Sequence, residues 1–373
     1  MSTNHRKRIL LVARHPVGGI LTFFRYIYRQ EAFNEYDFTV AVPGNEQEES
    51  LQKIFANCEF VFLPCESSLD MIKKTWSYLR ENNVSLVHSH GFSAGFLMVP
   101  VLMFHSLPHI VTSHDIFQNV HFAGASGRLI KYSFSLMFRF MDAIHTVGHE
   151  ATDNLKEYFP RISRNKIHCI PNGIDTEVFF NAKSSEDNDE LKKQGRYVIG
   201  FFGRFMSQKG FRDLVDAIDI ITNEKMSGKM PIVLTYGWGG YIREEYLLIE
   251  SRGLKHYFRQ MPHTDDMPSA LKSVDLVVMP SLWEAYPLLA MEALVAGVPI
   301  VGTDCIGLNE VLRGSPAARI SPKDPRALAK AIAYEMNNER EHEFCKYASV
   351  AKRRFSLVQP SSELKKLYEA LIS

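Results

Sequence analysis

The pattern that most constrains this 373-residue chain is an alternation of strand-like and helix-like segments that starts twice. The first start is an apolar strand pattern over residues 8–13, a loop containing Gly18 and Gly19, and helical spacing over residues 20–30. The second start is a strand pattern over residues 197–202, a loop to Gly210, and a helix over residues 211–224. Short β patterns alternating with helices predict parallel sheets with crossover helices. We therefore expect two α/β units.

A polar, mixed-charge stretch separates the two starts. Residues 181–196 have the composition of an exposed linker, and a chain of this length is expected to form two domains. The sequence thus predicts a first domain over residues 1–180, a linker over 181–196 and a second domain over 197–355.

Composition excludes several classes of protein. A net charge of +1 argues against a dedicated nucleic-acid binder. Five scattered cysteines without a C-x-x-C pair predict reduced thiols in a cytoplasmic protein. We read no signal peptide at the start of the chain, and the longest apolar run, residues 92–104, is too short to span a bilayer. Any membrane contact is therefore expected to be peripheral, at the inner face.

Two loops place glycines and cations after predicted strands, where open parallel sheets bind their ligands. Gly18 and Gly19 favour close approach of a phosphate or sugar, although an ordinary turn explains them equally well. Arg204 and Lys209, five positions apart, are spaced to converge on a pyrophosphate. The alternative there is a solvated basic loop.

The segment from Pro280 to Pro299 combines a strand end, a loop and a buried helix. Pro287 suits the first position of a helix, and Gly297 is expected to end it. The N–H groups of Leu288 and Leu289 then form an anion site. Glu284 lies in the loop and Glu292 inside the apolar helix, where a carboxylate needs a hydrogen-bonding partner. A glycosidase pair or a structural carboxylate are the alternatives.

Histidines follow two strands of the first unit. His114, after the strand at residues 110–112, is a candidate to orient a sugar or to help move a proton, against a purely structural imidazole. His88 and His90 are spaced for one face of a strand, but no third ligand is placed to complete a metal site. We therefore expect no metal and no cofactor.

Residues 128–141 carry two apolar stripes with interspersed arginine and lysine. Residues 130, 134, 137, 138 and 141 form one stripe, and residues 129, 132, 136 and 140 form the other. A core helix explains one stripe and is the favoured interpretation. Contact with a membrane interface is the alternative that uses both.

Taken in order, these motifs resemble those of the retaining, GT-B fold glycosyltransferases of family 4, the group 1 type. The two glutamates of the last motif match the family's E-x7-E pattern. One departure is Tyr236–Gly240, where the family usually has a glycine–acidic–glycine turn. The matching segments are Gly18–Gly19, His88–Gly91, Thr112–Asp115, Pro171–Asp175, Gly203–Gly210 and Ser281–Pro299.

The resemblance implies a fold and a set of roles. The fold is two Rossmann-like, doubly wound domains facing a cleft, with the acceptor in the first domain, the nucleotide sugar in the second, and the C-terminal helix of residues 356–373 crossing back to the first. Arg204 and Lys209 would neutralise the diphosphate, while Glu292 would hold the ribose. Glu284 would bind the transferred sugar. The remaining implied contacts are Leu288 and Leu289 N–H and Gly19 at the phosphate, and His114 at the donor sugar.

The predicted function is transfer of a hexose or N-acetylhexosamine from a nucleoside diphosphate, with UDP as the expected carrier, to a glycan or lipid-linked glycan in surface polysaccharide or lipopolysaccharide synthesis. A nucleotide-sugar epimerase of the same fold and a non-catalytic sugar-nucleotide-binding protein are the alternatives. The sequence names neither the sugar nor the acceptor.

Overall fold

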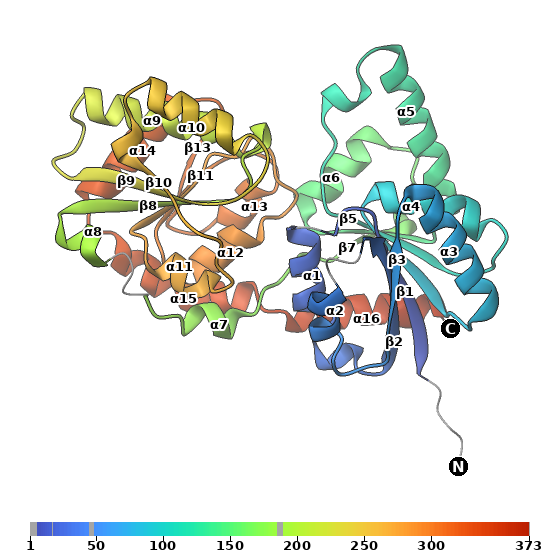
Figure 1. Cartoon of the computed structure of the whole chain (residues 1–373). Coiled ribbons are helices and arrows are strands. Elements are labelled where there is room, and N and C mark those ends of the chain that lie inside the picture. The colour runs from blue at the N-terminus through green and yellow to red at the C-terminus, as the bar shows by residue number, and fades with distance from the viewer. Residues whose placement is uncertain (1–5, 17, 45–47, 185–188, 373) are drawn as a thin grey trace. The chain divides into compact units, whose positions relative to one another are not determined.

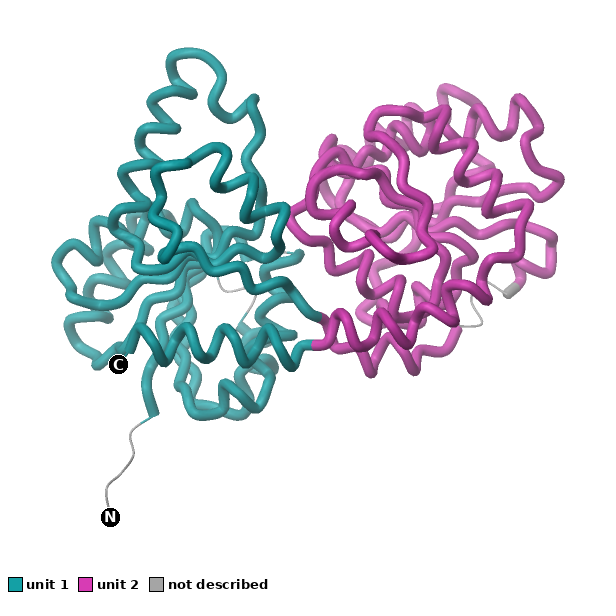
Figure 2. Tube along the Cα trace, turned by 180° about the vertical axis from the view of Figure 1, so that it is seen from behind, with its two compact units in different colours: residues 1–173, 357–373 teal, residues 174–356 magenta. Residues whose placement is uncertain are grey.

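Two compact units make up the computed structural model, which describes residues 6–16, 18–44, 48–184 and 189–372. Unit 1 contains the chain up to Gly173 and the segment from Leu357 onward, and unit 2 contains Ile174–Ser356 (Figures 1 and 2). The division falls at Gly173 rather than at residue 180, because helix α7 (Thr176–Phe180) packs against helices α12 and α15 of unit 2. Helix α8 (Asp189–Lys193), in the expected linker, packs against strand β8.

Unit 1 is a seven-stranded, parallel, doubly wound sheet in the order β3-β2-β1-β4-β5-β6-β7. Alternate residues of the first strand enter different cores: Ile9 and Leu11 pack with α1, α2 and α16, whereas Leu10 and Val12 pack with α3 and α4. Both faces are therefore covered, which is why the middle of the first strand is apolar on both faces. The strands are β1 Lys7–Ala13, β2 Tyr36–Pro43, β3 Phe60–Cys65, β4 Leu86–His90, β5 His109–Ser113, β6 Ala143–Thr146 and β7 Ile167–Cys169. The helices are α1 Gly19–Ile27, α2 Glu48–Ile54, α3 Ser68–Glu81, α4 Phe92–Leu102, α5 Gly124–Met137, α6 His149–Tyr158 and α16 Val358–Ile372.

Unit 2 is a six-stranded parallel sheet in the order β10-β9-β8-β11-β12-β13. One of its cores joins α9, α10 and α14 to a face of the sheet. The strands are β8 Arg196–Phe202, β9 Met230–Tyr236, β10 Phe258–Gln260, β11 Leu276–Met279, β12 Ile300–Thr303 and β13 Ala318–Ile320. Besides α7 and α8, the helices are α9 Phe211–Asn223, α10 Ile242–Ser251, α11 Met267–Lys272, α12 Leu288–Val295, α13 Leu308–Leu312, α14 Pro325–Asn337 and α15 Glu341–Arg354.

Each sheet has one point where the strand order reverses, between β1 and β4 in unit 1 and between β8 and β11 in unit 2. At such a point the loops leaving two neighbouring strands diverge and open a crevice for a ligand. In unit 2 these loops are residues 203–210 and 280–287, which carry Arg204, Lys209 and Glu284. The predicted two-unit α/β architecture is confirmed.

Candidate functional site

The two loops at the reversal point of unit 2 are held against each other by hydrogen bonds. Leu282 N–H donates to the Gln208 carbonyl at 2.8 Å, and the Gln208 side-chain amide donates to the Trp283 carbonyl at 2.9 Å. Gly210 has φ +63°, and a Cβ at that position would lie 1.9 Å from the Pro280 carbonyl oxygen. Only glycine permits this approach, so the sequence fixes the spacing of the two loops.

Lys209 and Glu284 meet where the loops converge. Lys209 Nζ lies 2.6 Å from Glu284 Oε1, and the Ser281 hydroxyl donates to the same oxygen at 2.7 Å. Glu284 is 7% exposed, so its carboxylate is held in a largely dehydrated place by one cation and one hydroxyl. A buried pair of this kind can exchange partners with the hydroxyl and phosphate groups of a ligand without leaving either charge uncompensated.

Helix α12 begins directly behind this pair. It starts at Leu288, with Pro287 preceding it in an extended conformation (ψ 122°) as the N-cap residue, not as the first helical residue. Leu288 and Leu289 are partly exposed at this end. Glu292 lies one helical turn further on and is 6% exposed. The two glutamates, the lysine and the helix N-terminus thus belong to one edge of the unit 2 sheet.

Arg204 lies in the same loop, with its side chain exposed. This part of the loop is joined to the segment after β9: Tyr241 N–H donates to the Phe205 carbonyl at 2.8 Å, and a Cβ on Gly237 would lie 1.8 Å from the Gly203 carbonyl oxygen. Trp238, within the segment that departs from the family pattern, is half exposed. This segment therefore packs closely against the backbone of the Arg204 loop and carries an exposed aromatic side chain.

The glycine loop of unit 1 ends at the start of α1. Gly18 is the N-cap residue with φ +56°, and an added Cβ on Gly18 or Gly19 would meet no atom within 4 Å. The turn needs glycine at position 18 for its backbone, because a side chain there is strained whatever the space around it. The two exposed glycines leave the N-terminal backbone of α1 open to a ligand.

His114 is the outermost ring of a histidine cluster at the carboxyl edge of unit 1. Its Nε2 lies 3.0 Å from Nδ1 of His90, and the His88 and His90 rings stack at 4.2 Å between centroids. Burial, with a smaller effect of His145, lowers the pKa of His114 to about 3, so the ring is neutral. His88 and His90 share one face of β4 as predicted. Among the described residues no three His, Cys, Asp or Glu side chains group as metal ligands.

Of the two apolar stripes of residues 128–141, one is mostly buried and the other is exposed. Most of the first stripe packs in the core: Phe134, Met137, Phe138 and Met141. Ile130, the remaining member, is 45% exposed. The core interpretation is therefore correct for one stripe only. The second stripe lies on the surface of α5 and the turn after it, which stand out from the sheet of unit 1 (Figure 1). Its members are Leu129, Tyr132, Leu136 and Phe140, exposed by 67, 68, 45 and 41%.

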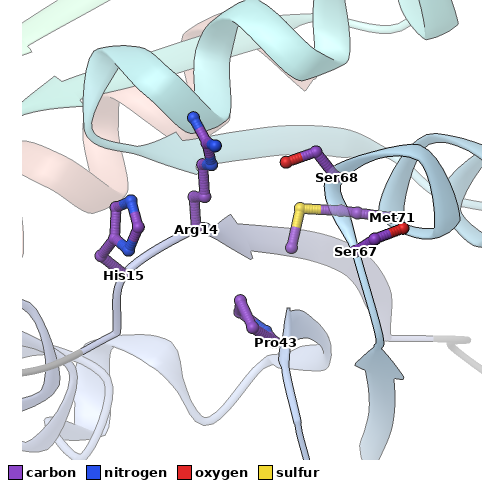
Figure 3. Close-up of a pocket in the computed structure, with 6 residues that line it drawn as sticks. All are labelled: Arg14, His15, Pro43, Ser67, Ser68 and Met71. Atoms are coloured by element: carbon purple, nitrogen blue, oxygen red, sulfur yellow. The ribbon is translucent and has the colours of Figure 1, made fainter.

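A hollow of about 240 Å³ opens at the carboxyl edge of the unit 1 sheet (Figure 3). It was not predicted from the sequence. Ser68 and Met71 of α3 face the loop after β1, which supplies Arg14. These groups offer a guanidinium and a hydroxyl to a polar ligand. The lining residues are Arg14, His15, Pro43, Ser67, Ser68 and Met71.

Sequence reasoning missed the residues that support the site rather than those proposed to act in it. Ser281 and Gln208 are ordinary polar residues in loops, and only their tertiary partners reveal their role. Thr303, on β12, donates to the Ser281 carbonyl at 2.5 Å. Tyr28, the C-cap residue of α1, and Tyr368, on α16, bond to the histidine cluster. The one available signal was that Ser281 and Gln208 flank motif residues.

Comparison with known proteins agrees with this architecture. Residues 17–178 match the family model described as Glycosyltransferase Family 4, and residues 196–338 match the model described as Glycosyl transferases group 1. The crystal structure of Anabaena HepE in complex with UDP-glucose covers 98% of this chain and 100% of its own, with a TM-score of 0.81 and 18% identity. That likeness shows the fold.

Two curated relatives are similar over part of their length. Alpha-maltose-1-phosphate synthase of Mycolicibacterium smegmatis is 24% identical over 61% of this chain and 62% of its own. UDP-Gal:alpha-D-GlcNAc-diphosphoundecaprenol alpha-1,3-galactosyltransferase of Escherichia coli is 26% identical over 63% of each chain. The chain thus spans about three fifths of these two relatives. With both units matched by family models and the fold shared along the whole chain, this protein belongs to the GT-B glycosyltransferases of family 4, group 1.

Proposed function

We propose that this glycosyltransferase moves a hexose or N-acetylhexosamine from UDP to a lipid-linked glycan, with retention at the anomeric carbon and without a bound metal. The observation that carries the proposal is the Lys209–Glu284 pair at the reversal point of unit 2, next to the start of α12. A cation, a carboxylate and a helix N-terminus at one sheet edge suit a ligand that has both phosphates and hydroxyls.

Each residue of unit 2 then has a role. Lys209 and Arg204 neutralise the diphosphate, and the N–H groups of Leu288 and Leu289 bind one phosphate. Glu284 shifts from Lys209 to the hydroxyls of the transferred sugar once the phosphate has taken its place beside the lysine. Glu292 accepts hydrogen bonds from the ribose. Fixed cations and a helix end supply the positive charge that a metal supplies in other enzymes.

Unit 1 supplies the remaining groups of the proposal. The exposed backbone at Gly18 and Gly19 binds phosphate, and neutral His114 contacts the donor sugar. In the chemical step the bond between the anomeric carbon and the phosphate oxygen breaks. The acceptor oxygen bonds to the same face of that carbon, and its proton passes to the departing phosphate. The negative charge that develops on the phosphate is what Lys209 stabilises.

The choice of donor and acceptor rests on relatives and on one surface. HepE binds UDP-glucose, and the Escherichia coli relative is named for a UDP-sugar and an acceptor attached to diphosphoundecaprenol. An acceptor of that kind lies in a membrane. Among the described residues no helix is long and apolar enough to span a bilayer. The exposed stripe of α5, with exposed Arg128 and Arg139 beside it, suits contact with an anionic inner membrane face.

Replacement of Lys209 tests the proposal directly. Lys209→Ala is expected to lower turnover of UDP-sugar by ~10²–10³, the effect of losing one transition-state charge stabiliser. Arg340→Ala is the matched control. Arg340 pairs at 2.5 Å with buried Glu335 at the C-terminal end of α14, which lies at the opposite edge of the sheet. The Arg340→Ala variant should be less stable than the wild type, yet it should keep normal turnover at temperatures where it stays folded. Equal turnover of the two folded variants would contradict the role of Lys209.

Sedimentation with liposomes tests the membrane contact. The protein should bind vesicles containing anionic lipid, and Leu136→Ser with Phe140→Ser should weaken that binding severalfold through the loss of buried apolar area. Leu247→Ser is the control, because Leu247 is 57% exposed on α10 of unit 2. Unchanged binding of the α5 variant would exclude this surface.

A further inference from the structure

A continuous hydrogen-bonded network lies behind His114, and it begins at a group that can only accept. His145 Nε2 lies 2.9 Å from the Ile170 carbonyl oxygen, and His145 Nδ1 lies 2.9 Å from the Thr112 hydroxyl. That hydroxyl lies 2.6 Å from His88 Nε2. The rings of His88 and His145 are fully buried, and burial keeps both of them neutral by lowering their pKa values.

The carbonyl fixes the direction of every proton along this segment. Since a carbonyl cannot donate, His145 must carry its proton on Nε2, which leaves a lone pair on Nδ1. Thr112 therefore donates its one proton to His145 and accepts from Nε2–H of His88. Neutral His88 is left with a lone pair on Nδ1, which needs a donor.

That donor comes from a pair of buried tyrosines. His88 Nδ1 lies 2.6 Å from the Tyr368 hydroxyl of α16 and 3.2 Å from the hydroxyl of Tyr28, the C-cap residue of α1. The two hydroxyls are 3.1 Å apart, and Tyr28 also lies 2.9 Å from His90 Nε2. Tyr28 is thus the one member that contacts His88, Tyr368 and His90 together.

Counting protons at these four contacts selects one form of His90. The two hydroxyls supply two protons, and His88 Nδ1 supplies none. If Nε2 of His90 carries a proton, three of the four contacts are hydrogen bonds; if it does not, only two are. Buried polar groups without partners are costly, so the first arrangement is favoured. His90 Nδ1 then holds a lone pair, and His114 Nε2, at 3.0 Å, must donate to it.

We propose that Tyr28 is a positioning residue that fixes this proton order and thereby leaves Nδ1 of His114 as an acceptor for a hydroxyl of the transferred sugar. The proposal rests on the role assigned to His114 above, and it makes that role specific: the ring accepts a hydrogen bond and does not donate one. His114 is only partly buried, and its Nδ1 bonds to no other residue that the structure describes.

Nitrogen-15 NMR of the full-length protein with labelled histidine measures the tautomer directly. His114→Asn assigns the resonances. The wild-type ring of His114 should be protonated on Nε2 and not on Nδ1. A proton on Nδ1 would overturn the proposal without any tyrosine variant being made, so the test survives a tyrosine variant that fails to fold.

Three tyrosine variants separate the network from its surroundings. Tyr28→Phe removes the acceptor of His90 Nε2–H and should shift His114 towards the Nδ1–H form. It should also raise KM for the donor by up to ~10-fold, the value of one neutral hydrogen bond, with a smaller change in kcat. Tyr368→Phe should keep the tautomer, because Tyr28 can still donate to His88 and accept from His90. Tyr36→Phe changes a buried hydroxyl of the same core that has no bond to the cluster, and should alter neither measurement.

The outcomes separate the proposed role of His114 in glycosyl transfer from the role of Tyr28 in fixing its tautomer. Normal kinetics of His114→Asn with the true substrates would remove His114 from the proposed reaction, while the tautomer would still report on the network. An unchanged His114 tautomer in folded Tyr28→Phe would overturn the inference and leave the proposed glycosyl transfer untouched.

Discussion

Mild acid should destabilise unit 1 far more than unit 2, because unit 1 buries four histidines completely. His88, His90, His109 and His145 are 0–1% exposed. Burial lowers the pKa of His109 to about 3 and that of His145 to about 4, and it lowers those of His88 and His90 well below the usual value. The unfolded chain binds protons near pH 6.5, whereas the folded chain does not. These buried histidines therefore make their full contribution to the free energy of unfolding at a pH above the pKa of an unfolded histidine. That contribution is lost as the pH falls towards their pKa values in the folded protein.

The size of the effect follows from linkage. Between pH 7.5 and 5.5 each such histidine removes about 1.4 kcal/mol from the free energy of unfolding, so four remove about 5.5 kcal/mol. A domain is commonly stable by only about 5–15 kcal/mol. Unit 1 should then approach its unfolding transition at pH 5.5, at which most carboxylates are still ionised.

Hydrogen exchange resolved by mass spectrometry can follow the two units in the intact protein. After correction for the intrinsic exchange rate, the opening free energy of β4 and β5 should fall steeply over this pH range, while that of β8 and β11 should change little. His109→Gln removes one of the groups that take up a proton on unfolding. The opening free energy of β4 and β5 should then fall less steeply with decreasing pH. His263→Gln should not have this effect, because the His263 side chain is 75% exposed. A nearly flat pH dependence for β4 and β5 would refute the reasoning.

Three further predictions concern unit 2 and its ligand. Gly210→Ala should destabilise unit 2 by ~2 kcal/mol or more in thermal melts, through positive φ and the clash with the Pro280 carbonyl. Gly195→Ala, at φ +73° with open space around it, should cost less, and equal losses would contradict the clash. Glu292→Gln should raise KM for the donor by ~10–100-fold with little change in kcat, as expected for lost charge-assisted bonds to ribose. An unchanged KM would remove that role. Treatment with EDTA should leave turnover unchanged, and a loss restored by added Mg²⁺ would disprove metal independence.

The fold was largely predictable because the sheet of each unit begins with a strand of seven residues that is apolar and buried over most of its length. Strands β1 and β8 appear in the sequence within a residue or so of their observed bounds. The two edge strands β10 and β13 escaped detection. Each is three residues long, and β10 has only Phe258 buried. A strand that pairs on one side and exposes most of its side chains leaves no apolar run to recognise.

The amphipathic segment after residue 124 shows where periodicity stops being informative. Two apolar stripes predict two buried surfaces, but only a tertiary structure shows which stripe meets a core. In the structure the face of Gly127 turns inward, and a Cβ there would lie 2.1 Å from the Phe122 backbone. The stripe opposite that contact is left exposed, and the sequence contains no signal that distinguishes it from the buried one.

The residues of the candidate sites also fall into a group that the sequence predicts and a group that it does not. Lys209 and Glu284 are 75 positions apart, yet both could be predicted, because each follows a strand and neighbouring parallel strands bring such loops to one edge. The bond between Tyr28 and Tyr368 joins positions 340 apart, one at the end of α1 and one on α16, where no rule of register applies. Strand topology thus predicts which residues gather at a sheet edge. The groups that orient them, such as Ser281, Thr303 and Tyr368, come from loops, strands and helices alike, and their positions follow only from the complete packing of the core.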